Sequence, residues 1–243
     1  MNNITVSVVL PAFQEEENLE KILPRIHECF DTLGVSYEIL VIDTVEPMDD
    51  TYRVCLHHYV TYCPREGGNC YGDAIRTGIE KARGKYLIIM DADGSHNPED
   101  IRRFYEEIIK EKYDLIIGSR YCKGGSTENS FILRFMSWSL NVTYRLLFGL
   151  KVKDVSNSFR MYHTEQLKQL RLQCDNFDIV EEILIALKHQ IKDFTVKEIP
   201  VSFNKRMAGK SKRNLWKFVL SYLRTMYRLM IIKKQHSQGN NKS

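Results

Sequence analysis

Short apolar runs recur along the first half of the chain, separated by amphipathic stretches. The runs are rich in Val, Ile and Leu, are bounded by Pro, Gly or Asp, and cover residues 5–10, 37–42, 86–90 and 114–118. Continuous runs of this kind are typical of strands buried on both faces of a parallel sheet. Helical periodicity is found between them, over residues 15–30, 71–82 and 98–112. The alternation predicts an α/β fold, a mostly parallel Rossmann-like sheet flanked by helices.

The pattern changes after Gly118. Residues 130–148 form a long helical stretch with more large apolar groups than an ordinary surface helix carries. A second helix is predicted to begin near Phe177, and a strand is expected within 194–203.

The C-terminal part differs from the rest in both pattern and charge. We expect one domain over residues 1–210, a basic amphipathic helix over 211–234 and a disordered tail over 235–243. The apolar stripe of this helix consists of Leu215, Phe218, Tyr222, Met226 and Leu229.

Charge is distributed unevenly beneath a modest net value of +4. No Asp or Glu follows Glu198, whereas eleven Lys and Arg residues lie between Lys205 and the end. A basic helix with one apolar face suits association with an anionic membrane surface. The apolar stretch 130–148, which contains Trp138, suits contact with a lipid chain. The alternative is that both helices pack on the sheet or on another subunit. No recognised nucleic-acid motif accompanies the charge, so we expect no nucleic-acid partner.

Composition narrows the class of protein further. A chain of 243 residues can bury one sizeable core. We find no charge-free run of about 18 residues and no signal peptide, so the sequence predicts no transmembrane helix. The six cysteines occur singly and form no CxxC pair. They are interpreted as reduced thiols of a cytoplasmic protein, peripheral at the membrane.

Two carboxylates follow the third apolar run directly, in "YLIIMDADGSHN". Asp91 and Asp93 fall where a buried strand is predicted to end, and ligands bind beyond this end of strands in open α/β sheets. Neighbouring carboxylates repel unless a cation lies between them, and Mg²⁺ or Mn²⁺ takes oxygen ligands. The pair is therefore interpreted as a metal site that presents a diphosphate. The alternative interpretation is a helix-initiating turn in which Asp93 or Asn97 caps the following helix.

Five further stretches of the chain belong together, namely "VVLPAFQEEENL", "MDADGSHNPE", "GSRYCKGG", "VKDVSNSFRMY" and "FNKRMAGKSK". In this order they resemble the family 2 glycosyltransferases of the GT-A fold. The similarity is greatest to the branch of dolichyl-phosphate mannosyltransferases and polyprenyl-phosphate glycosyltransferases. Each alone is weak, but together they cover nearly the whole chain and are specific.

The resemblance implies a nucleotide-sugar site at the first two strand ends. Pro11, Phe13 and Glu15 match a turn that touches the donor nucleotide. The end of the second strand, Ile42 and Asp43, matches the region that holds the nucleoside.

The resemblance also implies a metal between two acids. Asp91 and Asp93 match the acids that bind Mg²⁺ or Mn²⁺, with Ala92 between them at the donor. Ser95 stands where some relatives place a further metal ligand.

Three cations complete the implied site. Arg120 matches an arginine that faces the phosphates, and Arg206 and Lys212 match the basic pair of an R-x-x-G-x-S-K stretch. A leaving nucleoside diphosphate gains negative charge, which a metal and these cations would offset. Without the resemblance, Arg206 and Lys212 would be interpreted as a solvated basic surface.

Two departures bear on the substrates. The family usually has D-D-G-S-x-D after the second strand, whereas this chain has "VIDTVEPMDDT", with Thr44 in place of the second Asp. Residues 156–158, "SNS", replace a usual Thr-Ser-Gly near the acceptor or sugar. The donor base and sugar therefore stay open between GDP- and UDP-sugars.

The sequence thus predicts a metal-dependent inverting glycosyltransferase that moves a sugar to a polyprenyl phosphate. Asp91, Asp93, Arg120 and Glu182 are the candidate catalytic residues. An alternative acceptor is a sugar hydroxyl in cell-surface polysaccharide synthesis, for which Glu181 or Glu182 would be the general base. A phosphate acceptor needs no base because it is already an anion. A third hypothesis is a non-catalytic relative that binds a nucleotide or a partner.

Overall fold

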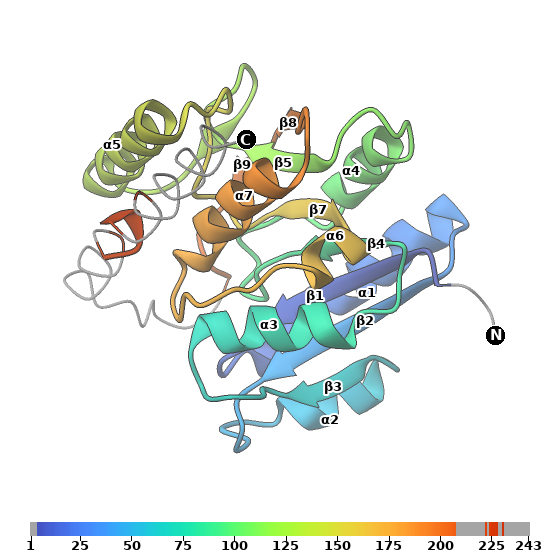
Figure 1. Cartoon of the computed structure of the whole chain (residues 1–243). Helices are drawn as coiled ribbons and strands as arrows, with labels where there is room; N and C mark the ends of the chain where they lie inside the picture. Colours follow the sequence, from blue (N-terminus) through green and yellow to red (C-terminus); the bar gives the residue numbers. More distant parts are fainter. Residues whose placement is uncertain (1–3, 208–221, 223, 228–229, 231–243) are drawn as a thin grey trace.

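A mixed sheet forms the centre of the molecule (Figure 1). The computed structural model describes residues 4–207, 222, 224–227 and 230. The sheet has the strand order β3-β2-β1-β4-β7-β5-β8, and β7 runs antiparallel to both of its neighbours. The strands are β1 (Val6–Pro11), β2 (Tyr37–Asp43), β3 (Thr61–Pro64), β4 (Tyr86–Ile89), β5 (Leu115–Ser119), β7 (Arg160–His163) and β8 (Val196–Pro200). A parallel pair, β6 (Ser126–Thr127) and β9 (Ser202–Phe203), lies beside it.

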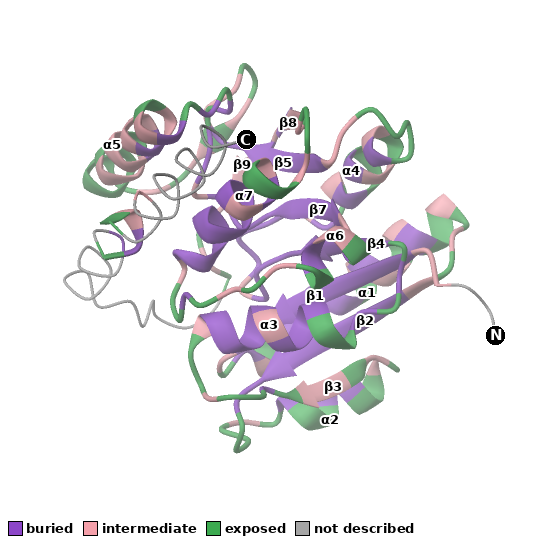
Figure 2. Ribbon diagram, viewed as in Figure 1, coloured by how far each residue is buried: buried purple, intermediate pink, exposed green. Residues whose placement is uncertain are grey.

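Helices cover both faces of the sheet. They are α1 (Glu16–Leu33), α2 (Thr51–His57), α3 (Tyr71–Lys81), α4 (Asp100–Ile108), α5 (Phe131–Phe148), α6 (Thr164–Lys168) and α7 (Ile179–Gln190). Residues of α3 and α7 share one hydrophobic layer with Leu87 and Ile89 of β4. Residues of α1 and α4 share the other layer with Tyr86 and Ile88. Successive side chains of a strand point to opposite faces, so an apolar run such as β4 supplies both layers. Figure 2 shows the neighbouring strands β1 and β2 buried along almost their whole length.

The α/β architecture and mostly parallel sheet predicted from the sequence are confirmed. Each of the four predicted strands forms within one residue of its expected bounds. The helix expected over 98–112 is shorter, and the strand expected within 194–203 is divided between β8 and β9. The sequence did not predict β3 and β7, which have four residues each and no long apolar run.

Helix α5 packs through a narrow face and exposes much of the rest. Its buried residues are Asn141, Tyr144 and Phe148. Its exposed apolar residues are Phe131, Ile132, Leu133, Phe135, Trp138 and Leu146. Phe131 and Leu146 retain 80% and 79% of their accessible surface. Many of the apolar side chains noted in this stretch of the sequence therefore remain exposed on α5 and are not buried against other described residues.

The predicted C-terminal helix falls largely outside the described residues, as do Lys212, the domain boundary at 210 and the tail over 235–243. The described positions 222, 224–227 and 230 are helical. Tyr222 is buried and lies edge-on to Tyr144 of α5, with ring centroids 6.5 Å apart. Met226 packs against the same core. At these two positions the apolar stripe faces the protein, whereas Tyr227 is exposed.

Candidate active site

Several of the predicted site residues lie at the carboxyl edge of the sheet. Strands β1, β2 and β4 are parallel neighbours, so their ends bring Pro11, Asp43 and Asp91 to the same edge. Pro11 and the side chains of Ile42 and Ala92 are buried in the protein. These three residues are therefore part of the packed edge of the sheet.

The acidic pair occupies the turn that follows β4. Asp91 is nearly buried, and the Asp93 side chain is 24% exposed. One oxygen of Asp93 accepts a hydrogen bond from the backbone nitrogen of Ser95, 3.0 Å away. The buried hydroxyl oxygen of Ser95 has no hydrogen-bond partner among the described residues. Two carboxylates and a hydroxyl are ligands that suit a hard divalent cation, so the donor set fits Mg²⁺ or Mn²⁺.

A buried histidine braces this turn. The backbone nitrogen of Asp91 donates to Nδ1 of His96 at 3.1 Å, so Nδ1 carries no proton and Nε2 is the donor. Nε2 contacts Oδ1 of Asn157 at 3.1 Å, and the Asn157 amide nitrogen donates to the carbonyl of Gly118 at 2.6 Å. The imidazole also stacks on Phe159. This chain of contacts ties the acidic turn to the end of β5.

Arg206 lies between two acids from distant parts of the sequence. It forms an ion pair with Glu15, and its Nε is 3.6 Å from Oδ2 of Asp93. The backbone nitrogen of Met207 donates to the carbonyl of Asp93 at 3.0 Å. Glu15 also accepts from the side-chain nitrogen of Asn18 at 2.6 Å. The structure thus unites two predicted donor-binding residues, Glu15 and Arg206, with the acidic pair.

Arg120 is held in a different way. Its guanidinium makes two 2.8 Å hydrogen bonds to the carboxylate of Asp154, and both side chains are buried. Burial alone would lower the pKa of Arg120, but the Asp154 charge outweighs it and raises that pKa. The same guanidinium contacts Ser156 at 2.8 Å and Ser137 of α5 at 3.4 Å. Its predicted role toward phosphate stays a prediction, and Asp154 is a partner that the sequence did not reveal.

The nucleoside side of the edge has a buried carboxylate of its own. Tyr62 donates to Oδ2 of Asp43 at 3.2 Å, and Oδ1 has no hydrogen-bond partner among the described residues. Burial raises the pKa of Asp43. Arg65 donates to the carbonyls of Ala12 and Asn69, and its guanidinium carbon lies 6.0 Å from the ring centre of Phe13. Arg65 therefore joins the loop after β1 to the loop before α3.

The loop after β2, where the sequence departs from the usual family pattern, is held by local hydrogen bonds. The hydroxyl of Thr44 donates to the carbonyl of Glu46 at 2.6 Å. Asp49 accepts from the backbone nitrogen of Glu16 at 3.1 Å, and Glu16 accepts from the backbone nitrogen of Asp50 at 2.6 Å. The altered loop is therefore anchored to the start of α1.

Comparison with known proteins identifies the family. The family model described as glycosyl transferase family 2 matches residues 7–171. The chain belongs to glycosyl transferase family 2.

Two curated relatives of this family 2 chain have names that bear on function. Dolichol-phosphate mannosyltransferase of Pyrococcus furiosus is 33% identical over 93% of this chain, which spans 63% of that relative's length. Polyprenol monophosphomannose synthase of Mycolicibacterium smegmatis is 30% identical over 84% of this chain and 79% of the relative.

Solved structures confirm the GT-A fold predicted from the sequence. Glucosyl-3-phosphoglycerate synthase from Mycobacterium tuberculosis, in complex with Mn²⁺, UDP and glucosyl-3-phosphoglycerate, superposes with a TM-score of 0.73. It is 18% identical, and the match covers 93% of this chain and 80% of that one. A complex of the same enzyme with Mg²⁺ and UDP gives a TM-score of 0.72 at 18% identity, over 93% and 79% of the two chains.

Glu181 and Glu182 are the two candidates for a general base in this family 2 chain. Glu182 accepts backbone hydrogen bonds, and Glu181 is buried. The Glu182 carboxylate accepts hydrogen bonds from the backbone nitrogens of Gln173 and Cys174, at 2.8 to 3.1 Å. Glu181 is fully buried, and burial raises its pKa to about 8 despite the nearby charge of Arg160. The backbone hydrogen bonds favour a structural role for Glu182, whose role in catalysis stays a prediction.

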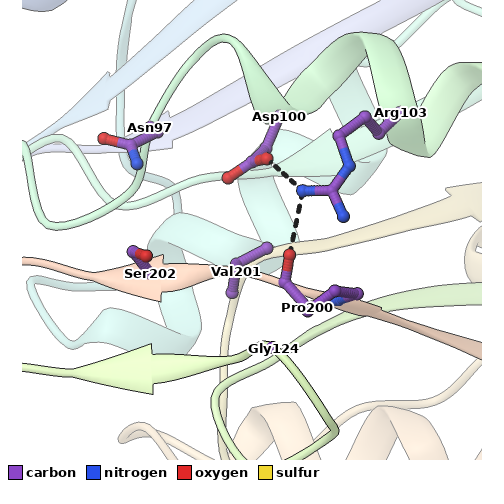
Figure 3. A pocket seen from close by; sticks show the side chains of 7 residues that line it. All are labelled: Asn97, Asp100, Arg103, Gly124, Pro200, Val201 and Ser202. Atoms are coloured by element: carbon purple, nitrogen blue, oxygen red, sulfur yellow. Dashed lines mark hydrogen bonds and ion pairs between the residues drawn. The ribbon is translucent and has the colours of Figure 1, made fainter.

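A separate hollow of about 270 Å³ opens beside α4 (Figure 3). Its lining consists of Asn97, Asp100, Arg103, Gly124, Pro200, Val201 and Ser202. Arg103 donates to Asp100 at 2.7 Å and to the carbonyl of Pro200 at 2.9 Å. The charges in its wall are thus paired with each other, which favours a structural role.

Two features are absent from the described residues. Within them, no three or more His, Cys, Asp or Glu side chains form a cluster that could hold a metal alone. No helix in the same part of the chain is both long and apolar enough to cross a membrane.

Proposed function

We propose that the protein transfers a hexose, with mannose the first candidate, from a nucleotide diphosphate sugar to a polyprenyl phosphate. The observation that carries this proposal is the acidic pair Asp91 and Asp93 beside Arg206, at the carboxyl edge of a family 2 fold. The names of the two curated relatives support the sugar and the acceptor. The Mn²⁺, Mg²⁺ and UDP in the glucosyl-3-phosphoglycerate synthase complexes support a metal-bound nucleotide.

The proposed roles follow from the charges. Asp91 and Asp93 would hold Mg²⁺ or Mn²⁺, which supplies positive charge for the departing diphosphate. Arg206 would turn from Glu15 and Asp93 toward the same diphosphate, with Lys212 as a second cation. Asp43 would accept hydrogen bonds from the nucleoside through its unpartnered oxygen. Whether the donor is a GDP- or a UDP-sugar is decided by the experiment below.

The chemical step is a single inverting displacement. An oxygen of the acceptor phosphate attacks the anomeric carbon and forms a new C–O bond. The bond from that carbon to the nucleoside diphosphate breaks, and its electron pair leaves with the diphosphate. No proton is removed from the nucleophile, so the step needs no general base, and Glu182 is already engaged by the backbone nitrogen of Cys174.

The acceptor lipid has an apolar surface available close to this site. Ser137 of α5 contacts Arg120, which we predict to face the phosphates, so α5 would lie beside the reacting groups. The exposed apolar residues of α5 then provide a surface for a prenyl chain, and the basic C-terminal residues would favour an anionic membrane. The proposal therefore places the protein at the cytoplasmic face of a membrane, as a peripheral protein.

A transfer assay tests the function. Labelled GDP-mannose, GDP-glucose, UDP-glucose and UDP-N-acetylglucosamine are each incubated with polyprenyl phosphate in detergent, with Mn²⁺ or with chelator. We expect label in the lipid phase from one donor, with Mn²⁺ only. Metal-dependent donor binding without a lipid product would instead favour a sugar-hydroxyl acceptor. Neither binding nor product would favour a non-catalytic relative.

A further inference from the structure

A tyrosine contacts the acidic pair from outside the turn that carries it. Tyr71 is the first residue of α3, and its hydroxyl donates to Oδ1 of Asp91 at 3.2 Å. Its ring stacks on Phe177, with centroids 4.1 Å apart and an interplanar angle of 22°. Tyr71 therefore links Asp91 to the segment 173–178, which precedes α7.

Segment 173–178 is fitted closely against the start of α3. The backbone nitrogen of Gly72 donates to the carbonyl of Asp175 at 2.7 Å. A Cβ atom at Gly72 would lie 2.1 Å from the carbonyl oxygen of Cys174, so only glycine allows this approach. Arg76 also donates to that carbonyl at 2.6 Å. Because both the ring and the backbone beside it are fixed, the Tyr71 hydroxyl has little freedom relative to Asp91.

The same segment is anchored on its other side. The carboxylate of Glu182 accepts from the backbone nitrogen of Cys174 at 2.8 Å. The hydroxyl of Thr225, in the C-terminal helix, donates to Asp178 and lies 3.4 Å from the sulfur of Cys174. Contacts therefore run from the C-terminal helix through segment 173–178 and Tyr71 to Asp91.

We propose that Tyr71 is a positioning residue that orients the Asp91 carboxylate for the divalent cation, with Phe177 and segment 173–178 holding the ring in place. The inference rests on the proposed function, because it takes Asp91 as a metal ligand. Partners hydrogen-bonded to a ligating carboxylate fix its orientation, and their removal typically weakens metal binding about 10- to 100-fold. The hydrogen bond from Tyr71 to Oδ1 limits rotation of the Asp91 carboxylate. Its remaining lone pairs therefore stay pointed toward the place where the cation would bind.

A matched pair of variants tests this role. Tyr71→Phe and Tyr62→Phe each remove one hydroxyl that donates to a strand-end carboxylate at 3.2 Å, one at Asp91 and the other at Asp43. We measure Mn²⁺ affinity without nucleotide by electron paramagnetic resonance, and melting temperature by calorimetry. Tyr71→Phe should weaken Mn²⁺ binding about 10-fold, whereas Tyr62→Phe should leave it unchanged. Equal Mn²⁺ affinity for wild type and Tyr71→Phe, or equal losses in both variants, would overturn the inference.

Two further variants separate this inference from the proposed function. Phe177→Leu retains the hydroxyl but removes its ring support, so we expect a smaller loss of Mn²⁺ affinity. If Tyr71→Phe does not fold, an unchanged affinity in Phe177→Leu overturns the inference by itself. Asp93→Asn should abolish Mn²⁺ binding. If Asp93→Asn binds Mn²⁺ like wild type, the metal site and hence the proposed function are wrong, whereas loss in Asp93→Asn with no change in Tyr71→Phe refutes only the role of Tyr71.

Discussion

Strand β2 carries a buried carboxylate near each end, and the two differ in how many hydrogen bonds they accept from the protein. Glu38, near the amino end, accepts from the Ser7 hydroxyl at 2.6 Å and from the backbone and side chain of Arg83 at 2.6 to 2.8 Å. Asp43, at the carboxyl end, accepts from Tyr62, and its second oxygen has no hydrogen-bond partner among the described residues.

This difference indicates that Glu38 has a structural role, whereas Asp43 has an oxygen left to bind a ligand. Buried carboxylates are costly unless they are paired, so the protein satisfies Glu38 within its own chain. At the other edge, Asp43 ends one strand and Asp91 and Asp93 follow another, and these carboxylates have fewer internal partners among the described residues. A metal and a nucleotide would complete them. Changes at the amino edge should therefore affect stability, and changes at the carboxyl edge should affect transfer.

The largest effect is expected at the acidic pair. Asp93→Asn removes a charge that we propose binds the metal, and should lower the transfer rate by about 1000-fold. The melting temperature should stay near that of wild type, because the Asp93 side chain is partly exposed. Rates from the lipid-extraction assay and calorimetry on the same preparation provide the check. A rate within tenfold of wild type would remove Asp93 from the site.

Arg206 should come next. Arg206→Ala removes a cation that we assign to the diphosphate, so kcat/KM for the donor should fall by about 100-fold. Lys205→Ala is the matched control, because Lys205 is the neighbouring cation and is exposed. Initial rates over a range of donor concentrations distinguish the two variants. Similar losses in both would indicate a general effect of surface charge instead of a specific contact.

The opposite edge should respond in stability alone. Glu38→Gln weakens hydrogen bonds to a charged group and should cost about 2 kcal/mol of unfolding free energy, measured by urea denaturation. Glu66→Gln is the control, because the Glu66–Lys81 ion pair is exposed and should contribute less than about 1 kcal/mol. Transfer per folded molecule should be unchanged in both variants. A large loss of activity in Glu38→Gln would contradict the division between the two edges.

A further effect concerns the pH dependence of stability. Burial raises the pKa of Glu181 from an ordinary 4.5 to about 8, so between these values the folded protein retains a proton that the unfolded chain loses. Its contribution to stability is full below pH 4.5 and is lost as the pH rises toward 8. Glu181→Gln carries no titrating group there, so its unfolding free energy should fall less over this interval. Parallel curves for the two proteins would show that Glu181 is ionised when folded.

The sequence predicted the elements whose signal is local. The apolar runs located β1, β2, β4 and β5, and the register of parallel neighbours brought Asp91 and Asp43 to the same edge. Short strands such as β7 were not predicted, because they derive their stability from neighbours and not from their own pattern.

The partners of the site residues were not predicted either. Arg120 was recognised by resemblance, but its pairing with Asp154 joins positions 34 residues apart. Tyr71 lies 20 residues from Asp91, and Arg206 lies 191 residues from Glu15. No periodicity encodes such contacts, since they depend on how the loops at the strand ends fold over one another.

The central claim is that a divalent cation and a nucleotide together complete the carboxylates at the carboxyl edge. Titration calorimetry of the protein with GDP and with UDP, each with Mn²⁺ and with chelator, tests it most directly. We expect binding of one nucleotide in the presence of Mn²⁺ and loss of that binding in chelator or in Asp93→Asn. Equally tight nucleotide binding without metal, or in Asp93→Asn, would contradict it.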